Sequence, residues 1–226
     1  MKTLPLQIRL LPLFRDLSDE AFGQLVRSCT YKRLSRGDTL CNKGDPSNGL
    51  FILMRGQLQV YEISRDGQEV GLNLLKGPTV FGELGVIDGL PRSADIMALT
   101  ESDVAVIPKT ILMQCFTASP QSSLSMLRHL TGMIRRLTQH QSVLAMPSVT
   151  QRVSAMLVEL GNRHAQDSEQ GFDLPKQKEL ASMVNTTRET VSRTLRQLID
   201  QKIIQKDKNR LRVLQPQALR QWAGLD

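Results

Sequence analysis

The sequence contains few aromatic residues and no long apolar run. Aromatic residues make up 4% of the 226 residues, which disfavours nucleic-acid binding by base stacking. No run approaches the ~20 apolar residues that a membrane span requires. The apolar stretch 1–14 lacks the small-residue cleavage site of a signal peptide. We therefore expect a cytoplasmic protein that does not contact a membrane.

The three cysteines, Cys29, Cys41 and Cys115, lie far apart in the sequence and form no C-x-x-C pair. Zinc and iron–sulfur sites commonly use closely spaced cysteine ligands, and the three histidines do not cluster either. We therefore expect no metal site. The cysteines are expected to be reduced, partly buried thiols.

Positive charge is concentrated toward the C-terminal end of the chain. The net charge is +7, and residues 174–214 contain ten basic and four acidic residues, a local charge of +6. Such a basic field suits the phosphate backbone of a nucleic acid, although a solvated basic face has the same composition. The apolar fraction of 40% and the length allow two globular domains.

The first half of the chain predicts a short helix followed by a strand-rich region. Residues 17–28 have helical apolar spacing, with Ser18 as the N-cap. Short apolar runs between glycine and aspartate turns then predict an antiparallel sandwich or barrel. Asp66-Gly67, between two such runs, predicts a hairpin. The runs are 49–54, 57–63, 69–75 and 103–107.

A long helix is predicted from about 119 to 145, because its apolar residues follow a narrow 3-4-3-4-3 ladder. This spacing is typical of a dimeric coiled-coil seam with one polar position, and a helix packed on its own domain is the alternative. Pro147 predicts the end of the helix and a linker. The ladder consists of Leu127, Leu130, Ile134, Leu137, Gln141 and Leu144.

The remaining residues predict a winged helix-turn-helix. Asn185 is expected to adopt a left-handed conformation in the turn, and Ala181 is small where two helices would cross. The expected helices are 149–164, 176–184, 188–200 and 217–222. The expected strands are 203–205 and 211–214, joined by a basic turn at 208–210.

The helix expected at 188–200 has the features of a DNA-reading helix. Thr187 is a suitable N-cap, and the apolar face is Val191, Leu195 and Leu198. The first turns of a recognition helix meet base edges, where arginine binds guanine and glutamate binds cytosine. An ion pair between positions i and i+4 is the alternative for Glu189 and Arg193. The predicted DNA-contacting residues are Thr187, Arg188, Glu189, Ser192 and Arg193 at bases, and Arg196, Lys208 and Arg210 at phosphates.

The segment 81–94, FGELGVIDGLPRSA, has the features of a pocket for a small phosphate. Gly82 and Gly85 allow close backbone approach, and Arg92 can bind phosphate oxygens. Glu83 could accept a hydrogen bond from a sugar hydroxyl. A structural Glu83–Arg92 ion pair explains the same spacing equally well. The segment offers no metal cluster and no nucleophile–base pair, which disfavours an enzyme that makes or cleaves nucleotides.

Over residues 17–214 the chain resembles the cyclic-AMP receptor protein and fumarate–nitrate regulator (CRP/FNR) family of transcription regulators. The segment 81–94 resembles the family's phosphate-binding cassette, and Arg188-Glu189 with Arg193 matches its base-reading positions. The resemblance implies an α+β fold: an N-terminal antiparallel β jelly-roll of the cyclic-nucleotide-binding type, a long dimerisation helix and a C-terminal winged helix-turn-helix. The corresponding ranges are 1–118, 119–146 and 147–226.

The resemblance also implies a function. The chain would be a homodimer that binds palindromic double-stranded DNA with TGTGA-like half-sites and contacts RNA polymerase, with loops 64–69 and 162–171 as candidate surfaces. Cyclic AMP is the expected effector, without a metal; a regulator with another effector, or none, is the alternative. The implied ligand-binding residues are Gly82, Glu83, Leu84, Arg92, Ser93, His140 and Gln141.

Two of these residues depart from the family pattern. Where the cyclic-AMP receptor has a Thr-Ser pair that contacts the adenine, this sequence has His140 and Gln141. The choice between adenine and guanine therefore stays open. By resemblance, Glu83 would bind the ribose 2′-hydroxyl, and Arg92 the cyclic phosphate with help from Ser93 and the Gly82 backbone.

Overall fold

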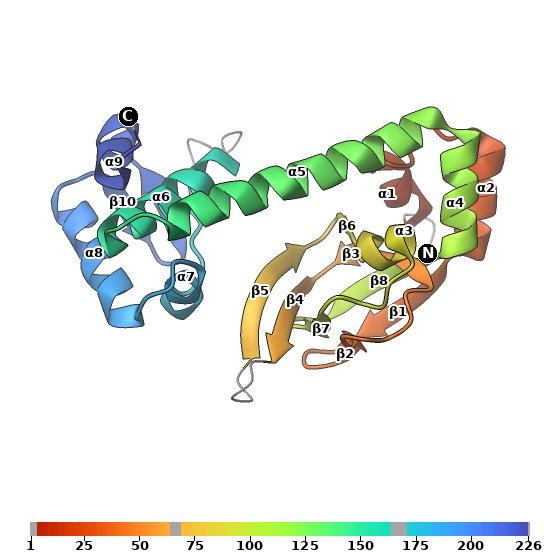
Figure 1. The fold of residues 1–226 in the computed structure, drawn as a ribbon, viewed down its shortest axis with the longest axis horizontal. Coiled ribbons are helices and arrows are strands. Elements are labelled where there is room, and N and C mark those ends of the chain that lie inside the picture. Colours follow the sequence, from red (N-terminus) through yellow and green to blue (C-terminus); the bar gives the residue numbers. More distant parts are fainter. Residues whose placement is uncertain (1–3, 64–68, 164–170, 226) are drawn as a thin grey trace. The chain divides into compact units, whose positions relative to one another are not determined.

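Figure 1 shows the fold of a computed structural model, which describes residues 4–63, 69–163 and 171–225. The chain divides into two compact units, Met1–Gly132 and Met133–Asp226. The boundary falls within the long helix α5 (Pro120–Leu144). The three-part division at residues 118 and 146 stays a prediction.

The N-terminal unit is built on two four-stranded antiparallel sheets, as expected (Figure 1). A hydrophobic cluster that includes Phe51, Leu58 and Ile96 contains residues from both sheets, so one core lies between them. The first sheet has the order β1 (Thr30–Leu34), β8 (Ser102–Pro108), β3 (Gly49–Arg55) and β6 (Thr79–Phe81). The second has the order β2 (Thr39–Cys41), β7 (Asp95–Ala98), β4 (Gln57–Ile63) and β5 (Glu69–Lys76).

The predicted hairpin is present, because β4 and β5 pair antiparallel along their whole lengths. Its register places Leu58 opposite Leu75 and Ile63 opposite Glu69. The turn residues Asp66-Gly67 lie outside the described residues. The strands that the apolar runs did not indicate are β1, β2, β6 and β7, which have three to five residues each, too few for a clear alternation.

A layer of helices covers the other face of the first sheet and forms a second core. Phe14 and Leu25 pack there with Leu50 and Ile52 of β3. The sequence did not indicate α1, whose Ile8 is fully buried in this core, whereas Ser18 caps α2 as predicted by accepting from the Ala21 amide. The helices of this unit are α1 (Leu4–Leu10), α2 (Asp19–Ser28), α3 (Glu83–Asp88), α4 (Lys109–Ala118) and the start of α5.

The C-terminal unit is a winged helix-turn-helix around a single core, as predicted. Asn185 has a φ of 49°, the left-handed conformation expected at the turn. Arg210 begins the second wing strand instead of ending the turn, because it pairs with Asp207. The elements are α6 (Val149–Arg163), β9 (Phe172–Asp173), α7 (Gln177–Met183), α8 (Arg188–Asp200), β10 (Ile204–Asp207), β11 (Arg210–Val213) and α9 (Pro216–Ala223).

The ladder on α5 is largely uncovered in the single chain. Leu127 is 59% exposed, and Ile134 and Leu137 are each 63% exposed. Leu130 is half-buried against the N-terminal core, and Val143, off the ladder, is buried in the C-terminal core. The ends of α5 are therefore packed, while a stripe of apolar side chains between them faces solvent. Separately, no helix among the described residues is both long and apolar enough to cross a membrane.

Truncation of a buried side chain of α8 tests the C-terminal core. Leu198 is fully buried, so we expect Leu198→Ala to lower the free energy of unfolding of this unit by about 2–5 kcal/mol. Ile199→Ala is the control, because the neighbouring Ile199 is 38% exposed and should cost much less. Urea unfolding followed by the fluorescence of Trp222, the single tryptophan, which packs on this core, measures both. Equal losses would contradict the described packing.

Candidate ligand pocket and DNA-reading helix

Two features require a glycine at position 82 of the cassette: its backbone conformation and the atoms that surround it. Gly82 has a φ of 75°, in the left-handed region, and it precedes the first residue of α3. A Cβ at this position would lie 2.6 Å from Nη1 of Arg92. Only glycine allows the cassette backbone to approach the Arg92 guanidinium this closely.

Arg92 is buried and fixed by the backbone and by an aromatic ring. Nη1 donates to the Gly82 carbonyl at 2.9 Å, and Nη2 donates to the Gly49 carbonyl at 2.6 Å. The guanidinium carbon lies 4.1 Å from the centre of the Phe51 ring, a cation–π contact. Burial lowers the pKa of the Arg92 guanidinium. Phe51 was not predicted, since nothing local in the sequence relates residues 41 positions apart.

Glu83 is also buried, with 3% of its surface exposed, but it does not form the alternative ion pair. Within the described residues, no ion pair within 4.0 Å joins Glu83 to Arg92. The two charged groups nevertheless interact at longer range, since the Glu83 carboxylate opposes the lowering of the Arg92 pKa. The cassette therefore holds a buried acid and a buried base that are not bonded to each other.

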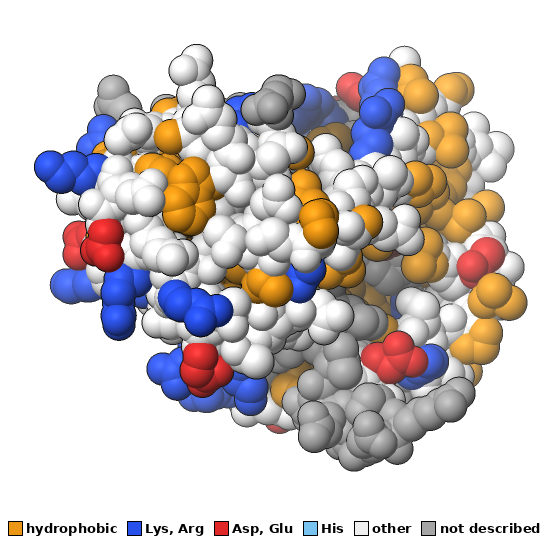
Figure 2. All heavy atoms as spheres, turned by 60° about the vertical axis from the view of Figure 1, so that its left-hand side comes forward, with side chains coloured by type: hydrophobic (Ala, Val, Ile, Leu, Met, Phe, Trp, Pro, Cys, Tyr) orange, Lys and Arg blue, Asp and Glu red, His pale blue; other side chains and the backbone are white. Residues whose placement is uncertain are grey.

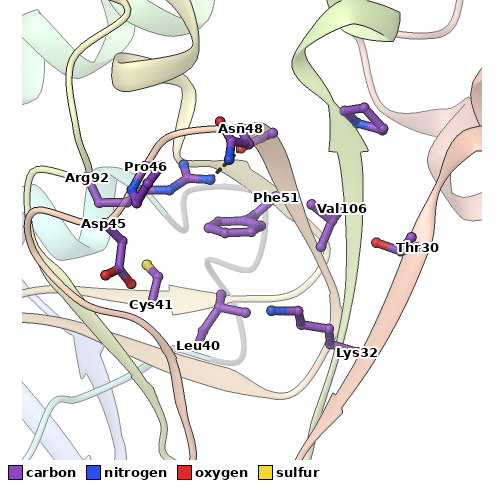
Figure 3. Close-up of a pocket in the computed structure, with 12 residues that line it drawn as sticks. Thr30, Lys32, Leu40, Cys41, Asp45, Pro46, Asn48, Phe51, Arg92 and Val106 are labelled. Carbon is purple, nitrogen blue, oxygen red and sulfur yellow. Dashed lines mark hydrogen bonds between the residues drawn. The ribbon is translucent and has the colours of Figure 1, made fainter.

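A cavity of about 370 Å³ lies beside Arg92 (Figure 3). Arg92 and Asp45 line it from one side, Lys32 lies opposite, and Phe51 forms part of the wall between them. Burial raises the pKa of the Cys41 thiol, which also lines the cavity. A volume of this size can hold a small molecule.

The structure brings some of the predicted ligand residues together and leaves others apart. Gly82, Glu83 and Arg92 gather at the start of α3, while Ser93 and Leu84 are exposed beside them. Glu83 and Ser93 are not among the residues that line the cavity. His140 and Gln141 lie on the part of α5 that belongs to the C-terminal unit, half-buried and exposed, respectively.

The candidate DNA-reading helix α8 has the two faces that its sequence predicted. Val191, Leu195 and Leu198 are buried, and the Thr187 side chain caps the helix by accepting from the Thr190 amide at 3.3 Å. The described ion pairs do not include Glu189 with Arg193. The predicted base-reading side chains are therefore on the surface and are not joined in the alternative ion pair. Arg188, Glu189 and Arg193 are exposed, as is Arg196, and Ser192 is half-buried.

On the face shown in Figure 2, Lys and Arg side chains are more widespread than Asp and Glu side chains. In the wing, Lys208 and Arg210 are both exposed. Arg210 lies 3.9 Å from the carboxylate of Asp173 in β9, the short strand that pairs with β11. The predicted phosphate contact at Arg210 therefore has an acidic neighbour that the sequence did not indicate, because a strand of two residues shows no periodicity.

A cavity beside a buried arginine, followed by a winged helix-turn-helix, indicates a ligand-binding domain joined to a DNA-binding domain. Comparison with known families agrees. Residues 31–119 match the cyclic nucleotide-binding domain, and residues 151–222 match the Crp-like helix-turn-helix domain. The described residues contain no group of three or more His, Cys, Asp or Glu side chains that could hold a metal ion.

Relatives extend the match over nearly the whole chain. The probable transcriptional regulator flp of Lacticaseibacillus casei is 27% identical, covering 94% of this chain and 95% of its own. A CRP-like cAMP-activated global transcriptional regulator of Mycobacterium tuberculosis (strain H37Rv) is 27% identical over 81% of this chain and 83% of its own. Among solved structures, FixK2 from Bradyrhizobium japonicum has a TM-score of 0.69 at 18% identity, covering 86% of this chain and 96% of its own, and supports the fold.

The chain belongs to the CRP family of transcription regulators, with a cyclic nucleotide-binding domain and a DNA-binding helix-turn-helix domain. The predicted family, the predicted fold and the prediction that the chain is not an enzyme are confirmed, because the family consists of transcription regulators.

Two glycine substitutions distinguish the destabilisation caused by backbone strain from the destabilisation caused by a contact with Arg92. An alanine in the left-handed conformation costs about 1–2 kcal/mol. We expect Gly82→Ala to destabilise the N-terminal unit by more than this, because the added Cβ would also contact the Arg92 guanidinium. Gly89→Ala is the control: its φ is 79°, but the nearest atom to its Cβ would be Lys109 Nζ at 3.9 Å. Thermal unfolding followed by circular dichroism compares them. Equal losses would mean that the guanidinium moves aside freely.

Proposed function

We propose that this protein is a homodimeric regulator whose binding to palindromic DNA is switched by cyclic AMP. The observation that carries the proposal is the buried Arg92 beside the Gly82 cassette, within a domain that matches the cyclic nucleotide-binding family. A relative named as cAMP-activated supports the choice of nucleotide. The exposed apolar ladder on α5 supports a dimer, since pairing two such helices would bury it.

In the ligand site, the cyclic phosphate takes the place of carbonyl oxygens as the partner of Arg92. A phosphate binds guanidinium more strongly than a neutral carbonyl does, because the hydrogen bonds are charge-assisted. Ser93 and the Gly82 backbone complete the phosphate contacts, and Leu84 lies beside them. Glu83 accepts from the ribose 2′-hydroxyl.

The base is assigned to His140 and Gln141, which follow the position of the adenine contacts in the family. Both side chains can donate and accept hydrogen bonds. Through this contact, ligand binding at the cassette would influence α5 and the DNA-binding domain. The ligand shifts the equilibrium only by the difference between its affinities for the two states.

On DNA, Arg188, Glu189 and Arg193 read bases in TGTGA-like half-sites, with Thr187 and Ser192 beside them. Arg196, Lys208 and Arg210 contact phosphates, which position the protein without reading the sequence. A two-fold dimer would place two α8 helices in successive major grooves, ~34 Å apart. The regulator acts in the cytoplasm and contacts RNA polymerase. The candidate contact loops, 64–69 and 162–171, fall mostly outside the described residues.

A regulator with another effector, or none, is the second candidate. The observation in its favour is that both Nη atoms of Arg92 already have carbonyl partners, so the cassette is satisfied without a phosphate. The relative from Lacticaseibacillus casei carries no nucleotide in its name.

Calorimetric titration with cyclic AMP, beside cyclic GMP, distinguishes the two candidates. We expect about one cyclic AMP per chain, and loss of binding in Arg92→Leu, because leucine cannot bind the phosphate. Size-exclusion chromatography should show that this variant is still a dimer. Arg36→Leu, at an exposed position of the same unit, is the control and should bind normally. Heat from neither nucleotide in the unmodified protein would favour the second candidate.

Substitutions on α8 test the assignment of base and phosphate contacts. We expect Arg193→Ala to weaken binding to the cognate site by about 1–3 kcal/mol and to relax specificity at one position, because a bidentate base contact is lost. Arg196→Ala should weaken binding to cognate and random DNA alike. Fluorescence anisotropy with both duplexes measures the difference. An equal loss on random DNA for Arg193→Ala would make Arg193 a phosphate contact.

A further inference from the structure

The guanidinium of Arg152 connects two segments of the C-terminal unit that are far apart in sequence. Arg152 lies on α6, and its Nη1 donates to the Met146 carbonyl at 3.0 Å. Its Nε donates to the Val184 carbonyl at 3.0 Å, and its Nη2 to the Asn185 carbonyl at 3.4 Å. All three partners are backbone atoms, so the contacts depend on the positions of the backbone and not on side-chain rotamers.

The three carbonyls belong to two different segments, the connection between α5 and α6 and the turn between α7 and α8. Met146 lies in the connection between α5 and α6, directly before Pro147. Val184 is the C-cap of α7, and Asn185 is the left-handed turn residue that leads to Thr187, the N-cap of α8. Carbonyls at the end of a helix lack partners within the helix, and a basic side chain satisfies them well.

Only arginine can make this connection. Its guanidinium is planar and carries its N–H donors in a fixed fork, so groups bonded on different sides keep a constant separation. A lysine ammonium could occupy the same space, but its three N–H donors all leave from one nitrogen and do not form a planar fork. A movement of the Met146 carbonyl therefore has to displace the guanidinium. The guanidinium is also bonded to the carbonyls of Val184 and Asn185, in the turn that sets the direction of α8.

We propose that Arg152 is a positioning residue that transmits the conformation of the α5–α6 connection to the DNA-reading helix. It contacts neither the proposed DNA residues nor the cassette by any described hydrogen bond or ion pair. The proposal does not require a particular effector, since any rearrangement at Met146 would be transmitted in the same way.

A double-mutant cycle on DNA affinity in the full-length protein tests this proposal. Pro147→Gly loosens the connection, and Arg152→Met removes the fork but keeps an apolar stem of similar length. The probe is the duplex that the unmodified protein binds most tightly after selection from random sequence. We expect Pro147→Gly alone to change the affinity for this duplex. When Arg152 is already replaced by Met, the same substitution should change the affinity less. The effects of the two substitutions should therefore deviate from additivity by about threefold to tenfold.

The matched control is a cycle of Pro147→Gly with Arg220→Met. Arg220 is exposed on α9, and its guanidinium forms none of the described hydrogen bonds or ion pairs, so these two changes should be additive within about twofold. The salt dependence of binding should be the same for Arg152→Met and the unmodified protein, because no phosphate contact is lost. Arg152→Lys, which keeps the charge but not the fork, should behave like Arg152→Met.

Three results would overturn the proposal. An additive Pro147–Arg152 cycle would give Arg152 a structural role only. No effect of Pro147→Gly on DNA affinity would mean that the connection does not influence α8. Full function of Arg152→Lys would show that the charge, and not the fork, matters; this variant also decides the case if Arg152→Met does not fold. None of these results depends on whether the unmodified protein responds to cyclic AMP, which the calorimetric titration decides separately.

Discussion

The structure of the cyclic nucleotide-binding domain depends on how the charge of the buried Arg92 guanidinium is stabilised. No carboxylate among the described residues is bonded to Arg92; two backbone carbonyls and the face of Phe51 stabilise its charge instead. Burying a charge is costly unless it is hydrogen-bonded, so these contacts constrain the backbone at Gly49 and Gly82. The β3 strand begins at Gly49 and the cassette helix begins after Gly82, and both positions are glycine because the surrounding atoms leave no room for a side chain.

Much of this architecture could be predicted from the sequence because its signals are local. The Ser18 and Thr187 caps, the left-handed Asn185 and the apolar face of α8 each depend on residues within a few positions of one another. The family resemblance added the cassette and the order of the domains. The short strands and α1 were missed because a few residues show no periodicity.

The contacts that fix the two proposed sites could not be predicted in the same way. Arg92 and Phe51 are 41 residues apart, and Arg152 is 33 residues from Asn185. The two residues of each pair come into contact only after the chain has folded, and no local sequence motif predicts either contact. The sequence therefore indicated which residues could bind a ligand or DNA, but not which residues hold those side chains in place.

The burial of β3 on both faces has a mechanical consequence. Successive side chains of a strand point in opposite directions, and here Phe51 lies in the core between the sheets while Leu50 and Ile52 lie in the core under the helices. Because protein interiors are close-packed, a shift of the Phe51 ring at the pocket cannot be absorbed locally. Leu50 and Ile52 are carried on the same backbone and share their core with residues of α1, α2 and α4, so Phe51 is coupled to the helical layer through β3. The wall of the pocket and the support of the helices therefore belong to one strand.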